Sequence, residues 1–174
     1  MGAMMVVRLI LAALVFAFAA VPAWSADQTF VAQLRGDNAT TNTGSKATGD
    51  AKLVVHGGKQ TVDLTMTIKG LTLADLSEHL SHMAVGPVHL HIYAANGDSS
   101  LLLPFPMGSN YAASADGFTL TVKNYPYADG AKIIASDITF DGFVKALQTG
   151  AIVLNVHTQK FADGEISGKV EAAH

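Results

Sequence analysis

Apolar and polar side chains alternate without a break from Thr61 to Ile68. Successive side chains of an extended strand point to opposite faces, so this period of two predicts a strand with one buried and one solvated face. The buried set consists of Val62, Leu64, Met66 and Ile68. A chain built from such strands has to pack the apolar face of a sheet against a second layer.

The same alternation recurs in segments that begin near Phe30, Ala51, Val88, Phe118, Ile152 and Ile166. Phe140 to Leu147 instead has helical spacing, with Asp137 or Thr139 as the candidate cap and Gly150 just beyond its end. A second short helix is predicted within Leu71 to Val85. About seven or eight short strands with one or two helical insertions predict an all-β fold, an antiparallel β-sandwich or flattened barrel.

Two segments are expected at the margins of this sheet. Pro104 interrupts the apolar run from Leu101 to Phe105, and proline lacks the N–H that a central strand must donate. That run is therefore predicted to be an edge strand. The segment from Tyr125 to Gly130 contains Pro, Asp and Gly and is predicted to be a loop.

Residues 1–25 differ from the rest of the chain. Arg8 precedes an almost wholly apolar run from Leu9 to Val21, and small residues follow. This order is typical of a secretory signal peptide cleaved before Ala26, and the run is shorter than the roughly 20 residues of a membrane-spanning helix. We expect one domain over 26–174, with no membrane span after cleavage and a periplasmic or secreted location.

Composition excludes several classes of function. The chain has no cysteine, which removes disulfides, thiolate metal ligands and cysteine nucleophiles, and an exported protein without disulfides fits a bacterial periplasm or cell exterior. Its formal net charge of −3 does not favour nucleic-acid binding, which requires clustered positive charge. Neither a Gly-x-Ser-x-Gly turn nor a phosphate-binding glycine loop is present. A protein partner cannot be named from the sequence.

Histidines supply the clearest chemical signal. His89 and His91 flank Leu90 on a predicted strand, so both imidazoles lie on one outer face if Leu90 enters the core. His157 follows Val156 with the same phase on a later strand. If the two strands are neighbours, three imidazoles converge, a ligand set that suits copper or zinc and leaves one coordination position open.

Further donors lie in the predicted short helix. His79 and His82 are three residues apart and therefore share one helical face. They are candidates for a fourth ligand or a second site, with Met83 and Met107 as soft donors. The alternative interpretation is an exposed helical face with methionines in the core.

Asn155 and Thr158 flank His157 on its predicted strand. Metal-bound imidazoles are usually oriented by a hydrogen bond through their second nitrogen, so these polar side chains are candidates for that role. Ordinary strand polarity explains them equally well.

Several motifs together resemble a known family. They are Ala47-Thr-Gly-Asp-Ala51, Lys69-Gly-Leu71, Gly86-Pro-Val-His-Leu-His-Ile-Tyr93, Val153-Leu-Asn-Val-His-Thr158 and Gly164-Glu-Ile-Ser-Gly-Lys-Val170. With them, the chain from about Thr29 to Val170 resembles the CHRD domain, a family named from chordin and common in exported bacterial proteins. The resemblance implies a Greek-key β-sandwich and places the conserved histidines of the family at His89, His91 and His157.

The chain departs from the family pattern on both sides of the His-x-His strand. A segment from Leu73 to Val85, which carries His79 and His82, replaces the usual short link before the strand. After the strand, Tyr93 to Gly97 replaces a Gly-Pro turn.

These features favour an exported protein that holds one transition-metal ion, copper before zinc, for copper binding or redox handling. One alternative is a metal-free adhesion or interaction module. Another is an enzyme like superoxide dismutase, because the His-Leu-His strand resembles the copper strand of copper/zinc superoxide dismutases, although their full ligand set and disulfide cysteines are missing. Whether the chain is an enzyme stays open at this point.

Overall fold

The computed structural model describes residues 26–40, 42–94 and 97–173, so the predicted signal peptide lies outside the described residues. The strands in chain order are β1 (Asp27–Arg35), β2 (Thr48–His56), β3 (Thr61–Lys69), β4 (Val88–Tyr93), β5 (Ser99–Phe105), β6 (Tyr111–Ser114), β7 (Gly117–Pro126), β8 (Ile152–Val156), β9 (Ile166–Lys169) and β10 (Glu171–Ala172). The helices are η1 (Gly36–Asn38), η2 (Leu73–Asp75), α1 (Glu78–Ser81), α2 (Tyr127–Ile133) and α3 (Phe140–Gln148).

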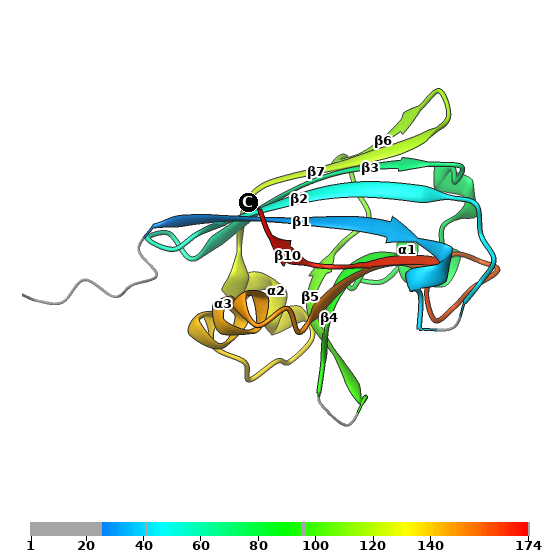
Figure 1. Ribbon diagram of the computed structural model, residues 1–174. Coiled ribbons are helices and arrows are strands. Elements are labelled where there is room, and N and C mark those ends of the chain that lie inside the picture. Colours follow the sequence, from blue (N-terminus) through cyan, green and yellow to red (C-terminus); the bar gives the residue numbers. More distant parts are fainter. Residues whose placement is uncertain (1–25, 41, 95–96, 174) are drawn as a thin grey trace, which may run out of the picture.

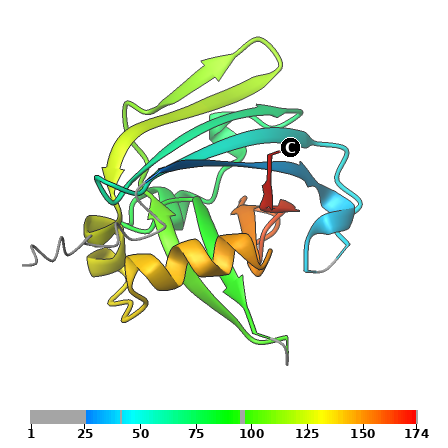
Figure 2. The same cartoon turned by 60° about the vertical axis from the view of Figure 1, so that its left-hand side comes forward.

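The predicted all-β class is confirmed. The strands form one ten-stranded sheet in the order β5-β4-β8-β9-β1-β2-β3-β7-β6, with β10 paired to β1. The sheet curls on itself, so that β1, β2, β3 and β7 face β4 and β5 across the interior (Figures 1 and 2). It is thus a single curled sheet, closest to the flattened barrel among the predicted forms.

One hydrophobic core fills the curl. On β3, the four predicted inward residues are at most 1% exposed. Burying a side chain of this size contributes about 1.5–3 kcal/mol, so the alternation of β3 alone accounts for a substantial share of the driving force for folding. The described residues include no helix long and apolar enough to cross a membrane.

The edge position of β5 is as predicted, whereas the loop predicted from Tyr125 to Gly130 is wrong. Strand β7 continues to Pro126, and α2 begins at Tyr127. The reason is tertiary, because the buried Tyr127 ring stacks 4.9 Å from the ring of Phe143, and its hydroxyl donates to the Ile138 carbonyl at 2.8 Å. These contacts hold a helical turn where the local sequence favours a loop.

Helix α3 is confirmed, and Thr139 caps it. The Thr139 hydroxyl accepts from the Gly142 N–H at 3.2 Å. We expect Thr139→Ala to lower the free energy of unfolding by about 1 kcal/mol, the usual cost of losing such a cap. Urea unfolding measures this loss, with Asp137→Ala, the other candidate cap, as the control. Equal losses in both variants would contradict the assignment.

Candidate metal centre

Strands β4 and β8 are neighbours, as the metal hypothesis requires. Leu90 pairs with Leu154, and His89 pairs with Asn155. His157 follows the last residue of β8, and its backbone N–H donates to the Pro87 carbonyl at 2.8 Å. The side chains of Pro87, His89 and His91 therefore lie on the same face as those of Asn155 and His157.

The three imidazoles meet on this face. The ring centroid of His89 lies 4.3 Å from that of His157 and 4.8 Å from that of His91, and those of His91 and His157 are 5.9 Å apart. One ring nitrogen from each lies within 4.8 Å of the other two. In the described part of the chain, no other group of three or more histidine, aspartate or glutamate side chains lies close enough together to share an ion.

Backbone carbonyls orient two of the rings. His157 Nδ1 lies 2.7 Å from the Ala162 carbonyl oxygen, and His89 Nδ1 lies 3.3 Å from that of Gly86. A carbonyl oxygen only accepts, so in each ring Nδ1 carries the proton and Nε2 keeps its lone pair. Metal-binding histidines are commonly held in this way.

Three of the four remaining ring nitrogens are buried and unpartnered. Neither nitrogen of His91 has a hydrogen bond, and neither does His157 Nε2. Leaving a buried polar atom unpaired costs about 1–3 kcal/mol, and a metal ion would bind the lone pair of His157 Nε2 and that of the His91 nitrogen that carries no proton. Bonds of about 2.0–2.1 Å to one ion bring nitrogens to within about 4.2 Å of each other, so binding would draw the rings slightly together.

The face that carries the histidines is not the open outer face that the sequence suggested. His89 and His157 are each only 5% exposed. The segment between β1 and β2 crosses this face. The Ser167 hydroxyl on β9 donates to the Asn38 carbonyl of this segment at 2.7 Å. Further along, the hydroxyls of Thr40 and Tyr93 lie 2.9 Å apart. The crossing explains why polar strand residues are buried here.

Glu165 directly precedes β9 and connects the segment between β1 and β2 to it. The sequence did not indicate this role. Its buried carboxylate accepts from the Ser45 hydroxyl at 2.6 Å and from the Thr158 hydroxyl at 2.7 Å. The Thr43 hydroxyl donates to the Glu165 backbone carbonyl at 2.8 Å. A glutamate after a Gly turn carries no local sign of burial.

The remaining candidate residues have different positions. Thr158 binds Glu165 through its hydroxyl, while Asn155 is 3% exposed and lies opposite His89. His79 and His82 are exposed on and just after α1, outside the three-histidine group. The structure therefore brings together three of the five histidines considered as ligands.

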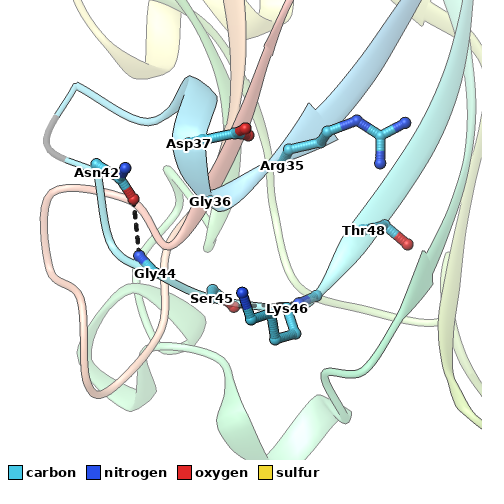
Figure 3. Close-up of a pocket in the computed structure, with 9 residues that line it drawn as sticks. Arg35, Gly36, Asp37, Asn42, Gly44, Ser45, Lys46 and Thr48 are labelled. Atoms are coloured by element: carbon cyan, nitrogen blue, oxygen red, sulfur yellow. Dashed lines mark hydrogen bonds between the residues drawn. The ribbon is translucent and has the colours of Figure 1, made fainter.

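A pocket elsewhere on the surface does not include these histidines. It lies between η1 and the start of β2, and residues including Arg35, Asp37 and Lys46 line it (Figure 3). The Asn42 side chain accepts from the Gly44 N–H at 3.0 Å and shapes its rim. The pocket contains neither an imidazole nor any of the unpaired buried atoms, so we do not assign the chemistry of the protein to it.

Burial controls the protonation of the cluster. It lowers the pKa of His89 to about 3 and that of His91 to about 4, and the nearby His157 adds to both shifts. Burial also lowers the pKa of His157, although the Ala162 carbonyl and the charge of Asp163 oppose it. All three imidazoles are therefore neutral at pH 7, the form that binds metals.

The lowered pKa values make the metal-free protein sensitive to acid. Below about pH 6.5, the ordinary histidine pKa, these residues take up protons in the unfolded chain before they do so in the folded one. Stability should therefore fall as the pH drops from 6.5 toward 4, by about 1.4 kcal/mol per pH unit for each of His89 and His91, and level off above 6.5.

Urea unfolding of the metal-free protein at pH 7 and pH 5 measures this effect. His91→Ala removes one of the histidines with a lowered pKa. The free energy of unfolding of this variant should therefore fall less between pH 7 and pH 5 than that of wild type. If the free energy of unfolding fell equally in wild type and variant, His91 would not contribute to the acid sensitivity.

The fold and the cluster together define a class of protein, an antiparallel β-domain with a buried group of three histidines on one sheet face. The family model of the CHRD domain matches residues 30–170 of the chain. The chain belongs to the CHRD domain family. Searches of curated proteins and of solved structures gave no match.

Proposed function

We propose that this chain is an exported CHRD-domain protein that binds one transition-metal ion, copper in preference to zinc, through His89, His91 and His157. Its role would be copper binding or redox handling in the periplasm or outside the cell. The observation that supports the proposal is the set of buried, unpartnered nitrogens on His91 and His157, which face one another within a group of neutral imidazoles. No carboxylate or thiolate belongs to this group.

Ligand chemistry favours copper. For a given set of nitrogen ligands, affinity among divalent first-row ions is highest for Cu²⁺. Three imidazoles also leave at least one coordination position of the ion open for water or another ligand. Zinc shares the preference for imidazole and is the alternative.

The experiment is a copper titration of protein that has no affinity tag containing histidine. We expect one tight equivalent per chain, and we expect equimolar zinc not to prevent copper from binding. A protein that is purified without metal and shows no tight equivalent would contradict the proposal. That outcome would favour the metal-free interaction module.

Export rests on the sequence of residues 1–25 alone. We expect the full chain, expressed in a bacterium, to leave the cytoplasm and to begin at Ala26 when its mass is measured. Cytoplasmic protein that keeps residues 1–25 would overturn this part of the proposal and leave metal binding unaffected.

A further inference from the structure

The segment from Ser77 to Pro87 is attached at both ends to one residue of the histidine cluster. The Ser77 N–H donates to the His157 carbonyl at 3.0 Å, and the His157 N–H donates to the Pro87 carbonyl at 2.8 Å. The carbonyl of Gly86, within the same segment, accepts from His89. The segment that carries His79 and His82 is therefore attached to the frame of the cluster.

Exposed metal donors gather on the outside of this segment. Glu78, His79, His82 and Met83 are all exposed, and Met83 is 44% exposed. Helix α1 ends at Ser81 with His82 as its C-cap, whose N–H donates to the Glu78 carbonyl at 3.2 Å. The Met83 N–H donates to the Leu80 carbonyl at 3.0 Å, so a further turn follows the helix.

Helical spacing brings these donors together on one side. His79 and His82 are three residues apart on α1 and its C-cap, so their Cβ atoms are separated by about 5–6 Å, and Met83 directly follows His82. Leu80 and Ser81, the other residues of the turn, are partly buried, and the Ser81 hydroxyl donates to the Ser77 carbonyl at 2.7 Å. The donors therefore share the solvent side of the turn.

The combination of donors points to copper. Imidazole binds both copper oxidation states, and a thioether adds preference for Cu(I). His79 and His82 belong to no preformed group of three or more histidine and acidic side chains, and their exposure leaves them free to rotate toward an ion.

We propose that His79, His82 and Met83 form a second, solvent-exposed copper site of lower affinity, which takes up the ion first and passes it to the buried cluster. The existence of the site is independent of the proposed function, whereas the transfer step depends on it. Transfer is ligand exchange, in which each copper bond to the outer donors is replaced by one to an imidazole of the cluster and the oxidation state stays the same.

Equilibrium titration with Cu²⁺, and with Cu(I) under anaerobic conditions, tests the site. We expect wild type to show a tight and a weaker binding event, the double variant His79→Ala/His82→Ala to lose only the weaker one, and His91→Ala to lose only the tight one. Met83→Leu should weaken the outer event for Cu(I) and leave it nearly unchanged for Cu²⁺. A weaker event that persists unchanged in the double variant, or is absent from wild type, would overturn the second site.

The same titrations separate this proposal from the buried site. If the tight event is missing from wild type while the weaker one still depends on His79 and His82, the proposed function fails and the outer site stands. His56→Ala, which removes an imidazole from another part of the surface, serves as the control and should leave both events unchanged.

Stopped-flow mixing with less than one equivalent of Cu²⁺ tests the transfer. An ion already bound on α1 is presented at an effective concentration far above micromolar, so loading of the buried cluster should be at least about tenfold slower in the double variant. Equal loading rates in wild type and double variant would overturn the transfer step.

Discussion

Replacing His91 with alanine is expected to weaken copper binding at the tight site by about 100-fold or more, since loss of a partner outside the ligand set already costs about 10–100-fold. Both ring nitrogens of His91 are buried without a hydrogen-bond partner, so no competing contact holds this side chain away from an ion. The variant leaves two imidazoles, which cannot enclose a trigonal or tetrahedral ion. Competition with a chelator of known affinity measures the change.

His56 provides the matched control for this experiment. Its Nδ1 lies 2.8 Å from an Asp27 carboxylate oxygen and its Nε2 3.5 Å from one of Asp63, far along the sheet from β4. His56→Ala should therefore keep the copper affinity of wild type. Unchanged affinity in His91→Ala, with a circular dichroism spectrum like that of wild type, would remove His91 from the site.

Gly86→Ala is expected to lower the stability of the fold strongly. Gly86 has a φ of +67°, and a Cβ atom there would overlap the carbonyl of Phe105 and lie 2.8 Å from Pro106 Cα. A non-glycine residue at positive φ costs about 1–3 kcal/mol, and the overlap with the backbone adds to this cost. We expect a loss of more than about 3 kcal/mol in urea unfolding.

Copper affinity should fall in the same variant. The Gly86 carbonyl accepts from His89 Nδ1, so a displaced backbone releases the ring that it orients. Gly44→Ala is the control, because Gly44 has a φ of +66° and an added Cβ would have no atom within 4 Å. It should lose about 1 kcal/mol and bind copper normally. Equal losses in the two variants would contradict the role of the Phe105 contact.

Periodicity predicted most of the strands because burial follows local sequence there. Because Leu90 points into the core, His89 and His91 were expected on the opposite face of the strand. The inward position of Val156 gave the same expectation for His157. Pairing of β4 with β8 has no local signal, since more than fifty residues separate these strands in the sequence. The family resemblance supplied that expectation, and the register confirms it.

Burial of the histidine face could not be predicted from the sequence. It depends on the segment between β1 and β2, whose Thr, Asn and Ser residues are typical of an exposed loop. That segment lies across the sheet because Ser45 and Thr43 bind Glu165, a contact between residues 120 or more positions apart. The same applies to α2, where Tyr127 overrides a local loop preference through its contact with Phe143.

X-ray absorption spectroscopy of the protein loaded with half an equivalent of copper tests the central claim most directly. At this ratio the ion occupies the tight site alone. The account predicts three imidazole nitrogens at about 2.0 Å, falling to two in His157→Ala. A wild-type spectrum without imidazole scattering, or one that His157→Ala leaves unchanged, would contradict a copper site at His89, His91 and His157.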